Sequence, residues 1–270
     1  MTPPPAIGVF DSGVGGLTVL RALRAALPAE DFIYLGDTAR LPYGTKTRDT
    51  VSRYALQSAE ALIARGIKAL VVACNTASAA ALPALRERCV GVPVVGVIEP
   101  GARAACEASR AGRIGVLATE STIRGGVYEQ TILRARPDAA VTGLACQVFV
   151  ALAEEGWTEG EAAIAVAERY LRPLLQQARP DTLLLGCTHF PVLRPVIAAV
   201  AGTGVTLIDS AATTAATVAA LLGERQLLRV AGTEGRTHFI ATDGVQRFAA
   251  VGSRFLGSPI DADEIELVDL

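Results

Sequence analysis

The sequence lacks the features that would place it in a membrane, on nucleic acid or outside the cell. No apolar run reaches the roughly 18 residues that a membrane span needs, and residues 1–5 lack the basic and apolar regions of a secretion signal. Lysine and arginine are scattered, and the net charge is −2, so no basic surface for nucleic acid or an anionic membrane is visible. These absences predict a cytoplasmic protein with neither partner.

Histidine is scarce, and the cysteines have no metal-binding spacing. The only histidines are His189 and His238, and no CxxC pair occurs, which argues against a metal site. Five cysteines make an odd number in a chain of 270 residues that needs no disulfide staples. We therefore expect reduced thiols, most of them small buried apolar residues.

Nucleotide-binding signatures are also missing. Residues 11–16 (DSGVGG) follow an apolar strand and open a helix, but they match neither the GxGxxG fingerprint nor the phosphate-binding loop. The glycines permit a tight turn and close approach of the backbone to a ligand. Asp11 is thus either a helix N-cap or a carboxylate that holds an ammonium group or assists a neighbouring thiol.

Short apolar runs alternate with amphipathic segments along the whole chain, in which 51% of residues are hydrophobic and 19% charged. This alternation predicts an α/β fold with mainly parallel sheets flanked by helices, and ligands at the carboxyl ends of the strands. The predicted strands are residues 7–10, 32–35, 69–73, 94–97, 114–117, 141–144, 183–185, 205–208, 237–241 and 265–268, and the predicted helices are residues 17–27, 51–65, 77–88, 125–134, 159–177, 192–201, 213–222 and 245–256.

The chain repeats itself. Residues 69–77 and 183–191 each run an apolar strand into a cysteine, a threonine and a helix-like segment, and the strand at Ile7 has an echo at Ile114 with similar spacing. We therefore predict two pseudo-symmetric domains, with one cysteine on each side of the crevice between them. The predicted first domain comprises residues 1–98 plus 212–270 and the second residues 99–211, with the two crossings near residues 93–101 and 209–213 acting as a hinge.

Cys74 and Cys187 are the candidate reactive groups. A cysteine at a strand end and helix start meets free backbone N–H groups and the positive end of the helix dipole, which lower a thiol pKa. Asn75, Thr76 and Thr188 follow the two sulfurs and could hold a carboxylate, although each threonine alone is as well explained as a helix cap. His189 could exchange protons with Cys187 or with substrate.

The motifs resemble those of the bacterial glutamate racemases, in the aspartate/glutamate racemase family. They are residues 11–18 (DSGVGGLT), 42–44 (PYG), 74–77 (CNTA) and 185–191 (LGCTHFP). The order and spacing agree over nearly the whole chain. The resemblance implies a cofactor-independent interconversion of L- and D-glutamate that supplies D-glutamate for peptidoglycan, in an enzyme commonly found as a homodimer.

The resemblance also implies roles for individual residues. Cys74 and Cys187 match the two catalytic acid/bases, assisted by Asp11, His189 and a glutamate that corresponds best to Glu154, with the adjacent Glu155 as the alternative. The positions that match substrate contacts are Asp11, Ser12, Pro42, Tyr43, Gly44, Asn75, Thr76, Thr119, Thr122, Thr188 and His189.

One departure from the family pattern lies just before this glutamate: Gln147 stands where a proline is expected, so the local loop geometry is predicted to differ. No lysine occupies a site motif, so a pyridoxal Schiff base is not suggested.

Three alternative functions fit parts of the sequence. An aspartate racemase would share the two thiols, but residues 42–44 and 186–191 favour glutamate. A regulator that binds nucleotides or anions would bind its ligand regardless of either thiol. A cysteine hydrolase would need one nucleophile and would form an acyl intermediate on it.

Overall fold

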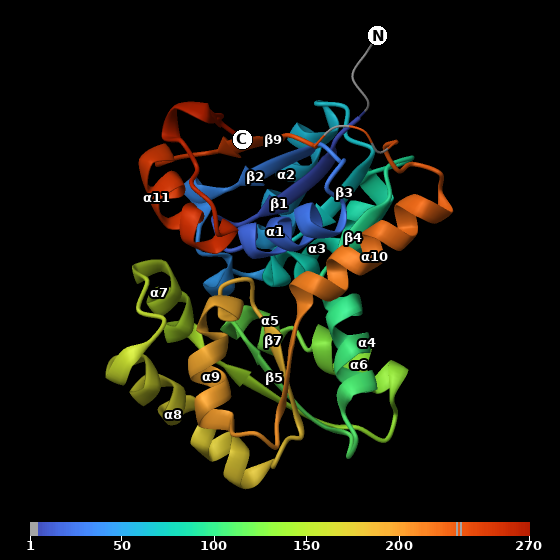
Figure 1. Cartoon of the computed structure of the whole chain (residues 1–270). Helices are drawn as coiled ribbons and strands as arrows, with labels where there is room; N and C mark the ends of the chain where they lie inside the picture. Colours follow the sequence, from blue (N-terminus) through green and yellow to red (C-terminus); the bar gives the residue numbers. More distant parts are fainter. Residues whose placement is uncertain (1–4, 231, 233) are drawn as a thin grey trace.

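The computed structural model describes residues 5–230, 232 and 234–270, and its strands form two parallel sheets that lie one above the other in Figure 1. The larger sheet has the strand order β10-β9-β2-β1-β3-β4, and the smaller has the order β6-β5-β7-β8. Each neighbouring pair in these orders is parallel. The predicted α/β fold class is therefore confirmed.

The strands lie close to their predicted positions. The larger sheet consists of β1 (Ile7–Asp11), β2 (Phe32–Gly36), β3 (Ala69–Val72), β4 (Val94–Gly96), β9 (Thr237–Ala241) and β10 (Ile265–Leu267), and the smaller of β5 (Arg113–Ala118), β6 (Ala140–Ala145), β7 (Thr182–Gly186) and β8 (Thr206–Asp209). Every residue of β1, β3 and β7 is buried, because helices cover both faces of a parallel sheet.

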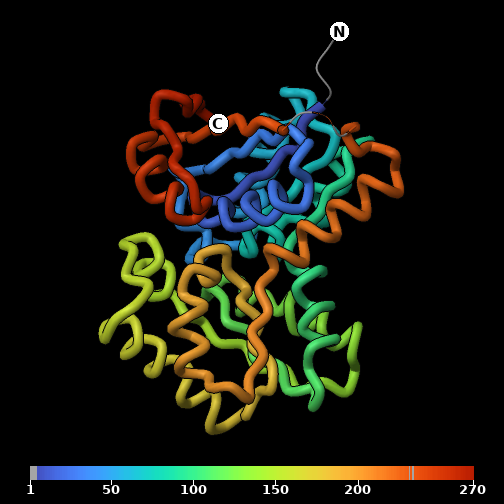
Figure 2. Tube along the Cα trace, viewed as in Figure 1, coloured from blue at the N-terminus to red at the C-terminus, as the bar shows by residue number. Residues whose placement is uncertain are grey.

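Helices enclose each sheet in layers (Figures 1 and 2). The helices are α1 (Leu17–Ala26), α2 (Arg48–Ile63), α3 (Asn75–Arg88), α4 (Ile98–Ala108), α5 (Glu120–Arg124), α6 (Val127–Ala135), α7 (Gln147–Glu155), α8 (Gly160–Gln177), α9 (Arg194–Ala201), α10 (Ser210–Glu224) and α11 (Val245–Leu256). Successive residues of β3 point to opposite faces of the larger sheet. Val71 packs in the apolar cluster that contains Leu17 of α1, and Val72 packs in the cluster that contains Val51 of α2. Among the described residues, no helix has both the length and the apolar character to cross a membrane.

The two segments that connect the sheets contain regular secondary structure. The expected crossing at residues 93–101 already contains the start of α4 at Ile98. At the second crossing, α10 begins at Ser210, with the Asp209 carboxylate accepting hydrogen bonds from the first backbone N–H groups of the helix. The first crossing is therefore β4 followed by the first turn of α4, and the second is the end of β8 followed by the first turn of α10, which begins three residues before the predicted helix start at residue 213.

The region around Gln147, where the sequence predicted a loop of altered geometry, is a helix. Gln147 is the first residue of α7, which runs to Glu155 and ends at Gly156 in the left-handed conformation (φ 76°). Glycine is the usual residue at such a helix end. The structure therefore places Glu154 in the last turn of a helix that faces the larger sheet.

Candidate active site

The residues singled out in the sequence converge where the two sheets face each other. Asp11 ends β1, Cys74 follows β3, Thr119 follows β5 and Cys187 follows β7. Carboxyl ends of parallel strands share one edge of a sheet, which is the usual place for a ligand. In this fold the two edges meet, so residues far apart in the sequence border one space.

Both thiols line the same cavity, whose volume is about 30 Å³. The lining residues come from both sheets and are Ser12, Pro42, Tyr43, Gly44, Cys74, Asn75, Thr76, Thr119, Gln147, Val150, Cys187, Thr188 and His189. Since a single water needs about 10–15 Å³, this space holds little more than water. Three predicted residues are not part of this lining. Thr122 and Glu154 contact the lining residues Thr76 and His189, and Asp11 accepts the Gly13 N–H.

Cys74 is a buried thiol at the start of α3. Its sulfur accepts a hydrogen bond from the Ala77 N–H at 3.4 Å and lies 3.7 Å from the Ser12 hydroxyl oxygen. Burial raises the pKa of Cys74 to about 12, and the negative charge of Asp11 adds to this rise, while the Ala77 N–H opposes it. The sequence predicted a lowered pKa from the helix start; the contact exists, but desolvation outweighs it.

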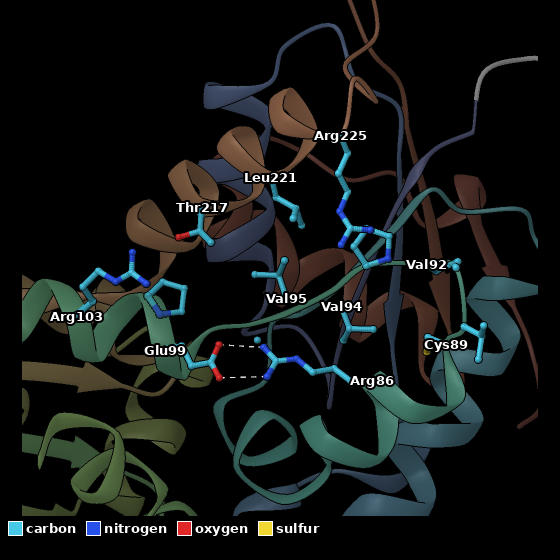
Figure 3. Close-up of a pocket in the computed structure, with 15 residues that line it drawn as sticks. Arg86, Cys89, Val92, Val94, Val95, Glu99, Arg103, Thr217, Leu221 and Arg225 are labelled. Atoms are coloured by element: carbon cyan, nitrogen blue, oxygen red, sulfur yellow. Dashed lines mark hydrogen bonds and ion pairs between the residues drawn. The ribbon is translucent and has the colours of Figure 1, made fainter. Parts of the chain in front are cut away.

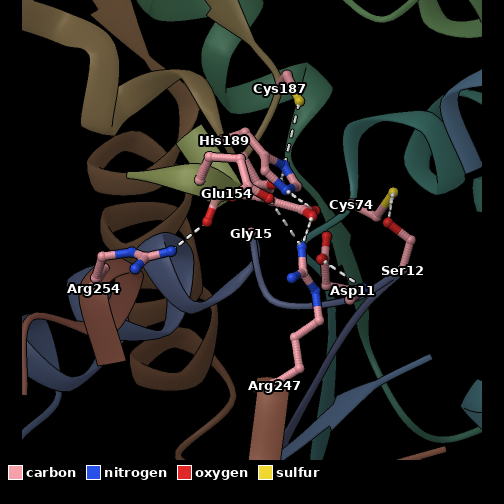
Figure 4. A network of polar contacts seen from close by, with 12 residues as sticks. Asp11, Ser12, Gly15, Cys74, Glu154, Cys187, His189, Arg247 and Arg254 are labelled. Atoms are coloured by element: carbon pink, nitrogen blue, oxygen red, sulfur yellow. Dashed lines mark hydrogen bonds and ion pairs between the residues drawn. The ribbon is translucent and has the colours of Figure 1, made fainter. Parts of the chain in front are cut away.

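Cys187 lies at the end of a chain of polar contacts (Figure 4). Its sulfur is 3.8 Å from His189 Nδ1, and His189 Nε2 is 3.1 Å from the Glu154 carboxylate. Burial disfavours charge on the imidazole, but the hydrogen bonds to Cys187 and Glu154 prevail and raise the pKa of His189 to about 10. A protonated imidazole can donate one N–H to the sulfur and the other to the carboxylate.

The structure distinguishes the two adjacent glutamates. Glu154 contacts His189 and has a side-chain exposure of 21%, whereas the Glu155 side chain is 62% exposed and lies 3.7 Å from Arg247. The hydrogen bond from His189 is the main cause of a lowered pKa at Glu154. Glu154 is thus the carboxylate of this network.

Asp11 is a fully buried carboxylate rather than the N-cap of α1, which begins at Leu17 after Gly16. One oxygen accepts the Gly13 N–H at 3.0 Å, and the other has no hydrogen-bond partner among the described residues. Burial raises its pKa, although the charge of His189 and the backbone N–H groups oppose the rise. Asp11 therefore acts electrostatically on both Cys74 and His189.

Three threonine hydroxyls join the sheets beside the thiols. Thr76 lies 3.0 Å from Thr119 and 3.1 Å from Thr122, which lie 3.0 Å from each other. Neither Thr76 nor Thr188 caps a helix, because Cys74 and His189 hold those positions. The capping interpretation is wrong for both, and the hydroxyls form a polar cluster that a carboxylate could share.

Sequence reasoning missed some residues of this site. Gln147 and Val150 of α7 line the cavity, and the Gln147 amide oxygen is buried without a hydrogen-bond partner among the described residues. Tyr128 of α6 accepts a hydrogen bond from the Asn75 side-chain amide at 2.6 Å. The departure at Gln147 was the one available signal, since Val150 and Tyr128 look like ordinary core residues in the sequence.

A larger cavity of about 560 Å³ lies elsewhere, between β4, α4 and α10 (Figure 3). Arg86, Arg103 and Arg225 line it, and Arg86 is paired with Glu99 through two hydrogen bonds. It contains none of the predicted site residues. Size alone therefore does not identify the reactive site, whereas the paired thiols do.

Comparisons with known proteins agree with this arrangement. The family model described as Asp/Glu/Hydantoin racemase matches residues 7–218. A glutamate racemase from Geobacter metallireducens is 53% identical over 258 residues, which cover 96% of this chain and 95% of that protein. A glutamate racemase from Bacillus anthracis has a similar solved structure, with a TM-score of 0.93, 38% identity and coverage of 98% of both chains. The glutamate racemase of Francisella tularensis, solved in complex with D-glutamate, has a TM-score of 0.90 and 37% identity, and the match covers 98% of this chain and 97% of that one.

Proposed function

The chain belongs to the Asp/Glu/Hydantoin racemase family and is an isomerase of the glutamate racemase group, and from this premise we propose that it interconverts L- and D-glutamate by proton transfer between Cys74, Cys187 and the substrate Cα. The observation that carries the proposal is that two thiols, from equivalent strand ends of the two sheets, line one cavity. Inversion at Cα requires a base on one face and an acid on the other, and facing thiols can supply both.

The protons balance in each direction. One cysteine, as thiolate, removes the Cα proton and becomes a thiol, and the electron pair of the broken C–H bond is delocalised into the α-carboxylate. The other cysteine, as thiol, delivers its proton to the opposite face of Cα and becomes a thiolate. The roles of Cys74 and Cys187 exchange for the reverse reaction, so turnover in each direction begins from the opposite protonation state.

The environment of each sulfur supports this division of labour. The raised pKa of Cys74 favours its protonated form, which is the acid, while the protonated His189 beside Cys187 can stabilise a thiolate. The threonine cluster and Thr188 offer hydrogen-bond donors for the carboxylates of the substrate and for the charge that develops on deprotonation. The lining residues include no lysine that could form a pyridoxal Schiff base, and a reaction without a cofactor is what the family resemblance implies.

Access of substrate requires the two sheets to separate. The space between the thiols holds little more than water, so we expect the cavity to widen as glutamate binds and to close for the chemistry. We take residues 1–98 with 212–270, and residues 99–211, as the moving domains, because these ranges contain the strands of the larger and smaller sheet respectively. The supply of D-glutamate for peptidoglycan and a homodimeric state, which the family resemblance implies, belong to the same proposal, as does the cytoplasmic location predicted from the sequence.

The test follows both the optical rotation and the Cα–H proton NMR signal of L-glutamate in D₂O, with no cofactor added. We expect the wild type to racemise glutamate with Cα exchange, and Cys74→Ser and Cys187→Ser each to lose about 10²-fold or more in rate. Cys106→Ser, in a partly exposed cysteine of α4, is the matched control and should keep the wild-type rate.

Three outcomes would contradict the proposal. Folded wild-type protein without exchange or optical change on glutamate would reject the activity, and exchange on aspartate in the same assay would redirect it to that substrate. Racemisation that survives loss of either thiol would reject the two-cysteine mechanism.

A further inference from the structure

Helix α11 contacts both members of the Glu154–His189 pair beside Cys187, although none of the residues of α11 belongs to a site motif. Arg247 Nη2 lies 3.2 Å from a Glu154 oxygen, and an Arg254 guanidinium N–H donates to the Glu154 backbone carbonyl (Figure 4). The Phe255 ring meets the His189 ring edge to face, with centroids 5.2 Å apart. Three side chains of one helix thus contact the two members of this pair.

These contacts cross between the two sheets. The apolar side of α11 packs against the larger sheet, where Phe248 contacts the rings of Tyr34 in β2 and Phe239 in β9. Glu154 lies at the end of α7, and α7 follows β6 of the smaller sheet. The arginines are seven residues apart and so share one face of α11, from which both reach the same turn of α7.

The Glu154 carboxylate has one oxygen for each partner. Oε1 is 3.1 Å from His189 Nε2, and Oε2 is 3.2 Å from Arg247 Nη2. Without Arg247 the carboxylate would be free to rotate about its terminal torsion or to turn toward solvent. With Arg247 present, the oxygen that faces His189 is fixed, and His189 in turn is fixed beside the Cys187 sulfur.

We propose that Arg247, supported by Arg254, is a positioning residue that holds Glu154 against His189 and so completes the proton-transfer chain of Cys187 only when the two sheets are closed on each other. The proposal rests on the two-cysteine racemisation proposed above. Arg247 itself touches neither thiol nor the cavity between them. Its side chain is 64% exposed, so the ion pair contributes little to stability in water, and its effect is expected in the reaction rather than in folding.

The decisive variant is Arg247→Gln, which removes the charge at an exposed position. Its matched control is Arg172→Gln, because Arg172 is also 64% exposed and pairs with a glutamate, Glu168, at 2.6 Å on the surface of α8. We expect kcat/KM for Arg247→Gln to fall roughly 10-fold, as for other misplaced catalytic groups, with an unchanged melting temperature. Arg172→Gln should match the wild type.

The isotope effect of Cα deuteration distinguishes positioning from a general defect. Because the two enantiomers are equally stable, kcat/KM must fall equally in both directions, so the asymmetry can appear only in the isotope effects. If proton transfer at Cys187 becomes slower, the isotope effect on kcat/KM should rise for the enantiomer whose Cα deuteron is removed by Cys187. The isotope effect should fall for the enantiomer whose Cα deuteron is removed by Cys74. Glu154→Gln should show the same asymmetry, which identifies the affected direction independently.

The pH profile gives a second readout. The groups that face Glu154 are His189, Arg247, the Arg254 guanidinium at its carbonyl, the neighbouring Glu155, and Asp243, which shares with Glu154 and Arg247 a cavity of about 190 Å³. His189 is the main cause of the low pKa of Glu154, and Arg247 lowers it further. Loss of Arg247 should therefore shift the acid limb of kcat/KM to higher pH.

The outcomes separate the two proposals. If the wild type does not racemise glutamate, the function itself is rejected. If the wild type is active and Arg247→Gln keeps its rate, isotope effects and pH profile, Arg247 has no positioning role. A fall in kcat/KM with symmetric isotope effects and an unshifted acid limb would also overturn the inference, since it would mark a general structural defect.

Discussion

At the scale of single residues, the two cysteines occupy equivalent positions after strands β3 and β7 but have different surroundings. Cys74 is buried near the Asp11 carboxylate, and burial and the charge of Asp11 together raise its pKa. Cys187 instead lies beside an imidazole whose pKa is raised to about 10. Equivalent backbone positions thus have different charged neighbours, a carboxylate near Cys74 and an imidazole near Cys187.

The absence of a side chain at Gly15 allows the glycine-rich turn after β1 to pack closely against Thr188 and His189. A Cβ at Gly15 would lie 2.4 Å from the Thr188 hydroxyl oxygen and 2.5 Å from the His189 ring, whereas a Cβ at Gly13 meets only Leu41, at 3.5 Å. Gly15→Ala should therefore displace His189, destabilise the protein by roughly 1–3 kcal/mol, and lower kcat/KM at least about 10-fold. Gly13→Ala should retain activity, as measured by the same racemisation assay and by thermal unfolding. Equal activity of the two variants would contradict the close packing.

At the scale of elements, the ends of helices from opposite sheets position the groups that face the substrate. Asn75 is the first residue of α3, which follows β3 of the larger sheet. Its side-chain amide donates a hydrogen bond to Tyr128, a buried residue of α6, which follows β5 of the smaller sheet. The Asn75 amide oxygen has no partner among the described residues. The tyrosine therefore fixes the direction of the side chain and leaves the oxygen free for a ligand.

Tyr128→Phe tests this contact. It removes the acceptor of the Asn75 amide and leaves a buried N–H group without that partner, which costs about 1–3 kcal/mol. We expect the free energy of unfolding to fall by this amount and KM for glutamate to rise, because Asn75 is no longer oriented. Chemical denaturation and steady-state kinetics measure the two effects. An unchanged KM in a destabilised variant would show that Asn75 does not need Tyr128 to bind substrate.

At the scale of the whole molecule, the charges of the site link the two sheets. His189 of the smaller sheet has Cys187 and Glu154 as hydrogen-bond partners, while Asp11 of the larger sheet acts on it through charge. Apolar packing is also shared, since one cluster contains Val71 of β3 and Leu185 of β7. The two sheets thus share both apolar packing and the electrostatics of the site.

The raised pKa of His189 predicts how stability depends on pH. The ordinary value is 6.5 and the folded value about 10, so above pH 6.5 the folded protein retains a proton that the unfolded chain releases. The associated stabilisation is fully present below pH 6.5 and is lost as the pH rises through about 10. The free energy of unfolding of the wild type, measured by denaturant titration, should fall more steeply over this window than that of His189→Asn. Parallel slopes would contradict a charged His189 in the folded state.

The sequence alone determined the fold class, the positions of most strands and most of the residues that line the candidate site. Alternating apolar and amphipathic segments are local signals, and the repeated strand–cysteine–threonine pattern located both thiols without any knowledge of tertiary contacts. The four motifs were likewise sufficient to indicate the family.

Only the tertiary structure decided which side chains support the thiols. The rotation of α7 selects Glu154 over Glu155 and turns Gln147 into the cavity, and the packing of α6 and α11 brings Tyr128 and Arg247 to the site from distant parts of the sequence. Likewise, the raised pKa of Cys74 follows from the depth of its burial rather than from the helix start visible in the sequence. The physical reason is that local patterns fix secondary structure, whereas desolvation, charge pairing and helix rotation depend on how the elements pack in three dimensions.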